Sequence, residues 1–279
     1  KSKRVIKMRR VVVTGLGMVS PLALTVPETW DAILKGKSGV RPITQFPTTD
    51  LSVRFSGSVQ DFDPTKYMHV KEVRRTDTFI QFALAAAQEA IQDAGIQITP
   101  ENARRIGVAV GSGIGGLPLL AKNQEILSTE GPRKISPFFI PSAIINMAPG
   151  YISIKHGIKG PNIAIVTACT TGAHNIGEAG RMIKYGDADV MIAGGTEMAT
   201  CPLGIAGFAS ARALSTRNDQ PEKASRPWDR DRDGFVLGGW CRNFNFRRIR
   251  ACEKTRRENL CRINWFRHEC RCISYDSTR

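Results

Sequence analysis

The feature that most constrains the fold is an alternation of short β-branched runs with helical patterns that end at glycine. Buried parallel strands are typically such runs, and the helices between them return the chain to the same edge of a sheet. A helix predicted from Asp77 to about Asp93 ends at Gly95, which suits a left-handed cap. The first strand is expected to stop at Gly15 and Gly17. Strands are predicted at residues 10–14, 106–110, 163–166 and 189–193, with a second helix over 170–185. The pattern predicts an α/β fold with a largely parallel sheet.

Cys169 lies where the third predicted strand meets the second predicted helix, in the stretch NIAIVTACTTGAHNIG at residues 162–177. Ligands of layered α/β folds collect at such junctions, at the carboxyl ends of the strands. Unpaired amides and the helix dipole favour an anion at a helix start, and so favour the reactive thiolate. Free cysteines are also frequently small hydrophobic residues of the core. The junction alone therefore leaves both a nucleophile and a packing residue open.

Positive charge is concentrated at the end of the chain. The 279 residues hold 40 Lys and Arg against 25 Asp and Glu, a net charge of +15. Residues 240–279 contribute 11 of these bases and 4 of the acids, together with five of the seven cysteines. A strongly basic protein commonly binds nucleic acid or another polyanion. The first 239 residues hold the other 29 bases and 21 acids, a net charge of +8, so a class assigned from the whole-chain average would mix two unlike segments.

No apolar run reaches the ~18 residues that a membrane-spanning helix needs. The basic start resembles a signal peptide, but Thr14 and Gly15 interrupt its apolar stretch and no small-residue cleavage site follows. We expect a cytoplasmic protein that starts at Met8 and binds no membrane. VTGLGMVS lacks the third glycine of a dinucleotide fingerprint, so no nucleotide site is expected.

The segment VTACTTGAHNIG resembles the nucleophile segment of the β-ketoacyl-acyl carrier protein synthases, the thiolase-like condensing enzymes. VVVTGLGMVSPL, GSGIGG, GPRKISPFFIPS, DADVMIAGGTE, ARALSTRND and SRPWDRDRDGFVLG follow the order of that family and are similar in detail to its type II members. The resemblance runs from Met8 to about Gly238. It implies the N-terminal βαβ half of a thiolase-like layered α-β-α-β-α fold over residues 1–239, and a homodimer joined by the strand before Cys169.

The resemblance implies a decarboxylating Claisen condensation of fatty-acid biosynthesis. Cys169 would receive an acyl chain as a thioester, and malonyl carrier protein would lose carbon dioxide and attack it. The backbone amide of Cys169 would form half of an oxyanion hole. Ile114 would gate the acyl pocket, with Phe139, Ala168 and Phe208 along its wall. Without the family, ordinary core packing is the better interpretation of these apolar residues.

A carrier protein is the partner that the resemblance implies. Acidic carrier proteins are met by basic residues, whose complementary charge steers the encounter more than it tightens it. An ordinary solvated face is the alternative for any run of charges. The matching positions are Lys71, Arg74, Arg75, Arg133, Lys134 and Arg212.

Histidines give no sign of a metal site or a catalytic base. His174 lies one turn into the helix after Cys169, but the catalytic histidines of the family lie elsewhere, so a structural role is expected. His69 and His156 have no ligand-like spacing. Neither a metal nor a cofactor is expected.

The family pattern breaks after Gly238. The last segment has no clear period, and three interpretations compete: a nucleic-acid-binding extension, a Cys/His metal module and an out-of-frame translation. Irregular cysteine spacing disfavours the metal module. Synonymous codons for RRIRACEKTRRE, read one base later, can encode EEYEHAKKRGE, which resembles the continuation of the family. We therefore expect a one-base frameshift near Gly239 and a disordered, basic tail over 240–279, with no nucleic-acid partner.

The break has a mechanistic consequence. The two histidines and the lysine that type II synthases use would follow the frameshift, the first of them at a codon that straddles Ser274 and Tyr275. We therefore expect the chain as printed to be nearly inactive in condensation, with an unknown acyl-length preference. A related thiolase or polyketide condensing subunit and a non-catalytic carrier-protein-binding fragment remain the alternatives.

Overall fold

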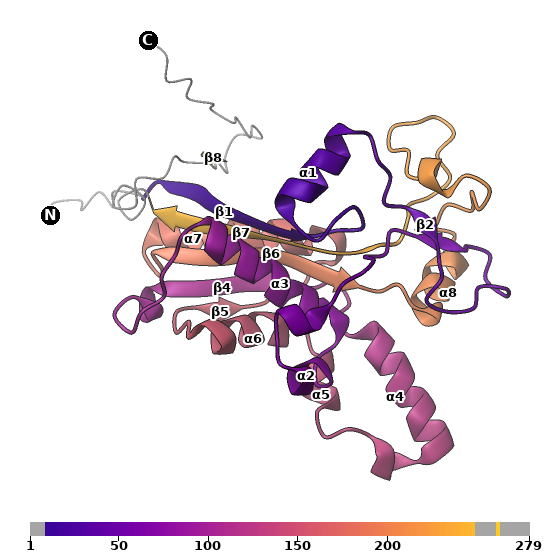
Figure 1. Ribbon diagram of the computed structural model, residues 1–279, viewed down its shortest axis with the longest axis horizontal. Helices are drawn as coiled ribbons and strands as arrows, with labels where there is room; N and C mark the ends of the chain where they lie inside the picture. Colours follow the sequence, from indigo (N-terminus) through magenta and orange to yellow (C-terminus); the bar gives the residue numbers. More distant parts are fainter. Residues whose placement is uncertain (1–8, 249–260, 263–279) are drawn as a thin grey trace, which may run out of the picture.

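The computed structural model describes residues 9–248 and 261–262, which are built around one six-stranded sheet (Figure 1). The strands lie in the order β5-β4-β6-β7-β1-β8. They are β1 Val11–Val19, β4 Ile106–Gly111, β5 Asn162–Ile163, β6 Val190–Met198, β7 Gly239–Arg248 and β8 Cys261–Arg262, and a separate ribbon pairs β2 Arg41–Pro42 with β3 Phe55–Ser56.

The sheet is mixed. β4 pairs parallel with β5 and β6, whereas β7 pairs antiparallel with β6 on one side and with β1 on the other. The four strands predicted from the sequence therefore all point the same way, as expected. β7, which the sequence did not predict, inserts between two of them in the opposite direction.

Helices cover both faces of this sheet. Both predicted helices are confirmed: Asp77 caps α3 by accepting a hydrogen bond from the Phe79 amide, and α7 ends at the left-handed Gly186. Across residues 9–248 and 261–262, no helix is long and apolar enough to cross a membrane. The helices are α1 Val26–Leu34, α2 Val70–Val73, α3 Thr78–Asp93, α4 Leu117–Glu130, α5 Phe139–Ala143, α6 Met147–His156, α7 Thr171–Tyr185 and α8 Pro202–Ser210, with short 3₁₀ turns η1 Pro64–Lys66, η2 Ala103–Arg105, η3 Pro132–Lys134, η4 Ala168–Thr170 and η5 Pro221–Lys223.

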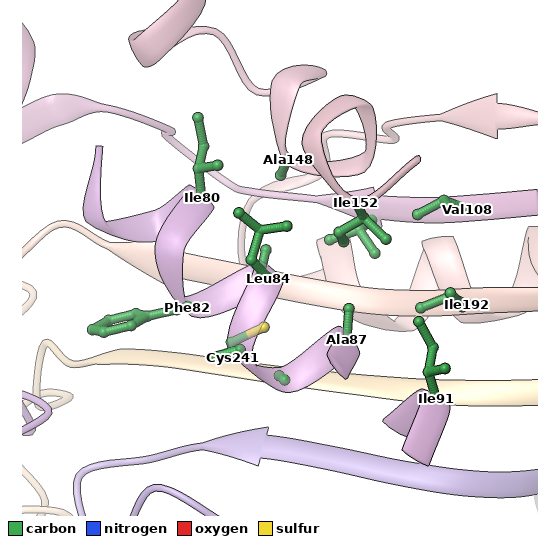
Figure 2. Close-up of a cluster of buried hydrophobic side chains, with 14 of the residues drawn as sticks. Ile80, Phe82, Leu84, Ala87, Ile91, Val108, Ala148, Ile152, Ile192 and Cys241 are labelled. Carbon is green, nitrogen blue, oxygen red and sulfur yellow. The ribbon is translucent and has the colours of Figure 1, made fainter. Parts of the chain in front are cut away.

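The core follows the two-residue period of the central strands. Val108 and Ile192 pack with α3 and α6 in the larger cluster, which Figure 2 shows together with Ile80, Leu84 and Ile152. The residues next to them in sequence point to the other face. Ala109, Met191 and Ala193 pack there against Ala179 and Ile183 of α7. This alternation buries both faces of the sheet.

β1 continues through Gly15 and Gly17, so the prediction that these glycines end the strand was wrong. α3 crosses β1 too closely for a side chain. A Cβ on Gly17 would lie 1.8 Å from the carbonyl oxygen of Ala86, and one on Gly15 would lie 2.4 Å from that of Ala90. Glycine is needed here for close approach and not for a turn.

Two other strand boundaries differ from the prediction. The strand expected at residues 163–166 is only β5, because both backbone polar groups of Ile165 bond to the side chain of Asn175 and not to a neighbouring strand. The strand expected at 189–193 continues to Met198, because β7 pairs with it along its whole length.

The expectation of disorder is wrong for residues 240–248. They form most of β7, a central strand that α3 and α7 contact from opposite faces. Cys241 is fully buried in the larger cluster, beside Phe82 (Figure 2). Residues 261–262 add the edge strand β8. The remaining tail residues, including Cys252, Cys270 and Cys272, lie outside the described part of the chain, as does the proposed start at Met8.

Candidate active site

Cys169 is exposed on the turn η4, which leads directly into α7. The residue before it, Ala168, has φ +51°, in the left-handed region. A residue with a Cβ is disfavoured there by about 1–2 kcal/mol, and such strain persists only where neighbouring contacts fix the backbone. The turn therefore presents the Cys169 thiol from a strained, constrained backbone at the start of a helix.

Side chains of α7 supply that constraint. Asn175 is completely buried, and its side chain accepts a hydrogen bond from the Ile165 amide at 3.1 Å and donates one to the Ile165 carbonyl at 2.9 Å. Thr171 Oγ1 accepts from the Thr167 amide at 2.9 Å. His174 Nδ1 lies 2.8 Å from Thr167 Oγ1, which agrees with a structural role. Three α7 residues thus hold the segment that enters η4.

The start of α7 also packs directly on β6. A Cβ on Gly195 would lie 2.9 Å from the Cα of Gly172 and 3.1 Å from its amide nitrogen. Backbone therefore meets backbone at this point. The contact fixes the height of the first turn of α7, and with it Cys169, above the sheet.

The other cysteines with described side chains differ from Cys169. Cys201 is buried, and burial raises the pKa of its thiol. Burial raises the pKa of Cys241 to about 12. Both thiols are therefore protonated and shielded at neutral pH. Cys169 is the thiol of this group that can meet an electrophile, which favours the nucleophile over the packing residue that the sequence left open.

The predicted pocket residues lie around a loop beside Cys169. Ile114 lies in the loop between β4 and α4 and is 37% exposed. Its neighbour Gly113 lies against Ala168, since a Cβ there would be 3.3 Å from the Ala168 carbonyl oxygen. Phe139 begins α5, and Phe208 of α8 packs edge-to-face on Phe235; α5 and α8 both contact α4. The structure places the loop that carries Ile114 against Ala168 through Gly113, and a pocket shared by all four residues stays a prediction.

Two carboxylates, buried Asp77 and half-buried Glu197, hold the start of α4 and this loop. The sequence predicted a helix cap at Asp77 and no role for Glu197. Glu197 of β6 accepts hydrogen bonds from Ser112 Oγ and from the amides of Gly113 and Ile114. Asp77 accepts from the Leu119 amide at 3.2 Å. Burial, with a smaller contribution from the charge of Glu197, raises the pKa of Asp77 to about 6. GGTE was recognised as a motif, but its pairing with the loop depends on tertiary structure.

All six basic residues predicted to meet a carrier protein are exposed. The Arg75 guanidinium lies 4.1 Å above the Phe138 ring, which joins the segment after α2 to the loop that carries Arg133 and Lys134. Lys71 lies in α2 and Arg74 directly after it. Arg212 follows α8 and belongs to a separate element. Their contact with a partner stays a prediction.

Two further histidines, His69 and His156, lie in the described part of the chain. His69 caps α2, its Nδ1 accepting from the Lys71 amide at 3.2 Å. Burial, and next the Lys155 charge, lowers the pKa of His156 to about 4. Within the described residues, no group of three or more His, Cys, Asp and Glu side chains is placed to hold a metal ion.

Comparison with known proteins decides the family. The profile described as "Beta-ketoacyl synthase, N-terminal domain" matches residues 8–240. The chain belongs to the β-ketoacyl synthase family. Among curated proteins, the chain is 63% identical over 230 residues to 3-oxoacyl-[acyl-carrier-protein] synthase 2 of Coxiella burnetii, a match to 82% of this chain and 56% of that protein. It is 60% identical to the Vibrio harveyi protein of the same name, covering 82% of this chain and 55% of that one.

Solved structures of related proteins have the same fold as this chain. A β-ketoacyl synthase from Burkholderia phymatum has a TM-score of 0.81 at 26% identity, over 91% of this chain and 62% of that one. A type II polyketide ketosynthase in complex with its acyl-carrier protein has a TM-score of 0.77 at 31% identity, with the same coverage. A match to 91% of the chain extends past residue 240, where the family profile ends. The chain spans about 56% of the length of the curated relatives that it matches.

Asp77 predicts a dependence of stability on pH. The folded chain holds the Asp77 proton more tightly than the unfolded chain, because the pKa of Asp77 is raised from 3.8 to about 6. The contribution of Asp77 to the free energy of unfolding is therefore full below pH 4 and falls by about 3 kcal/mol as pH rises to 6.

Urea unfolding of wild type and Asp77→Asn between pH 4 and pH 7 measures this contribution. The Asn variant should lack that part of the decline. Asp63→Asn is the matched control, because Asp63 also caps a short helix but has a lowered pKa through its side-chain bond to Thr65. A decline of equal size in wild type and Asp77→Asn would contradict the assignment.

Proposed function

We propose that the chain is the N-terminal half of a 3-oxoacyl-[acyl-carrier-protein] synthase and that Cys169 receives the acyl group. The observation that carries this proposal is the exposed thiol on a constrained turn at the start of α7, while Cys201 and Cys241 are buried. The relatives of the same name supply the substrate class.

The step assigned to this chain is acyl transfer. The Cys169 thiolate attacks the thioester carbonyl of an acyl carrier protein, and the oxyanion that forms is stabilised by backbone amides. The bond to the carrier thiol then breaks, and that thiol leaves with the proton that Cys169 lost. Decarboxylation of malonyl carrier protein and carbon–carbon bond formation belong to the whole relatives, of whose length this chain matches 56%.

A carrier protein is the proposed partner. Support comes from the exposed basic residues near α2, η3 and α8, and from the related ketosynthase solved with its acyl-carrier protein. Ile114, Phe139, Ala168 and Phe208 are the proposed pocket residues. The homodimer and the cytoplasmic location implied by the resemblance are also part of this proposal.

The second candidate is a carrier-protein-binding fragment without catalysis. The same exposed bases favour it, because they can steer an acidic partner whether or not acyl transfer follows.

Acyl transfer to Cys169 is the direct test. Incubating the chain with acyl carrier protein that bears a fatty acyl group should add one acyl mass to the peptide that contains Cys169. Cys169→Ser should abolish this thioester, whereas Cys201→Ser should retain it. Carrier-protein binding without an acyl mass would favour the non-catalytic fragment. Absence of both binding and acyl transfer would reject the proposal.

We also propose that the sequence after Gly239 is out of frame by one base. β7 is a central strand covered on both faces, and such strands are predominantly apolar. Its sequence, GWCRNFNFRR, contains three arginines and two asparagines. The fold therefore needs a strand at this place, and the printed residues are poorly suited to it. The family profile ends at residue 240, at the same point.

Resequencing of codons 236–242, with the intact mass of the protein made from that gene, tests the frame. One base added or lost relative to the printed reading is the expected result. An uninterrupted reading, together with a mass that matches the printed tail, would reject the frameshift.

A further inference from the structure

Glu197 holds an entire loop through one carboxylate. Its Oε1 accepts from Ser112 Oγ at 2.9 Å, and its Oε2 accepts from the Gly113 amide at 2.9 Å and the Ile114 amide at 3.0 Å. Ser112 Oγ in turn accepts from the Gly115 amide at 3.1 Å. Four consecutive residues, 112–115, are thus fixed by a single side chain.

The held loop lies against the strained turn that precedes Cys169. A Cβ on Gly113 would be 2.9 Å from Glu197 Oε2 and 3.3 Å from the Ala168 carbonyl oxygen. Carboxylate, loop and turn are therefore packed together with no space for a side chain between them. A change in the bonds of Glu197 must move the loop relative to Ala168, and Ile114 moves with it.

The loop is fixed at its far end as well. The Gly116 amide donates to the Ala143 carbonyl at 3.1 Å, and the Leu119 amide donates to Asp77. These contacts leave residues 112–115 as the part whose position depends on Glu197. Burial raises the pKa of Glu197, while its hydrogen bonds lower it, so the carboxylate is retained in a buried place through the donors of this loop.

We propose that Glu197 is a positioning residue that sets which substrates reach Cys169, by fixing Ile114 at a defined distance from the turn. The assignment of the substrates as acyl chains rests on the proposed function. The positioning itself rests on the bonds of Glu197 and can be tested without acyl transfer. Glutamine at this place would keep the volume but remove the charge, so the Gly113 and Ile114 amides would donate to a neutral oxygen and be held less tightly. Its NH₂ group would face the Ser112 hydroxyl.

Size selectivity at Cys169 tests the proposal. The rate constants for alkylation of Cys169 by iodoacetamide and by N-decyl iodoacetamide are measured by peptide mass spectrometry, and their ratio is compared between variants. Glu197→Gln should raise the decyl-to-iodoacetamide ratio by about tenfold, because the loop is released. Ser112→Ala removes one donor to Glu197 and the acceptor of the Gly115 amide but keeps the bonds of Gly113 and Ile114, so it should shift the ratio in the same direction by less.

Glu89→Gln is the matched control. Glu89 is also partly buried, and its carboxylate accepts from two backbone amides, those of Met18 and Val26, each at 2.8 Å. A general loss of stability would therefore affect both variants alike, whereas only Glu197 holds the loop. An unchanged ratio in Glu197→Gln and Ser112→Ala, or an equal shift in Glu89→Gln, would overturn the proposal.

The two proposals fail separately. A shifted ratio in a chain whose Cys169 accepts no acyl group would retain the positioning role and reject the proposed function. Acyl transfer with an unchanged ratio would do the reverse.

Discussion

The close contact between the first turn of α7 and β6 is the constraint on which the site depends. Gly172 and Gly195 bring two backbones together, and this sets the depth at which α7 lies on the sheet. Asn175, one turn further on, can then reach both polar groups of Ile165 and end the pairing of β5 early. The chain consequently enters η4 from a fixed point, and Ala168 is held in a conformation that its side chain disfavours. Packing and hydrogen bonding together place Cys169 outside the core at a helix start.

β6 contributes to the site at a second level. Gly195 receives α7, and two residues later Glu197 receives the loop after β4. The two segments that flank Cys169 are therefore registered against the same strand. β6 pairs with β4 on one side and with β7 on the other. β7 therefore supports this geometry through its backbone pairing with β6. Because β7 is covered on both faces, its position in the sheet favours a strand of predominantly apolar residues.

The sequence allowed the α/β class, both long helices and the position of Cys169 to be predicted, because β-branched runs, glycine caps and a strand–helix junction are local signals. It misassigned Gly15 and Gly17, whose role depends on α3 crossing β1 at a distance that no local pattern encodes. β7 was missed because its residues suit a buried strand poorly, so only pairing with β6 and β1 identifies it. Glu197 was missed for a similar reason, since its partners lie more than 80 residues away. The pocket residues and the carrier-protein residues were predicted from the resemblance to the family. Their roles stay predictions.

The central claim is that the fold around Cys169, and not its exposure alone, makes this thiol reactive. The most direct measurement compares the rate constant for iodoacetamide labelling of Cys169 at pH 7 in the folded chain with that in the chain unfolded in urea, resolved by peptide mass spectrometry. A constrained turn that presents the sulfur at the start of a helix predicts faster labelling in the folded chain, by at least about threefold. Equal or slower labelling of the folded chain would contradict the claim that this turn activates the sulfur.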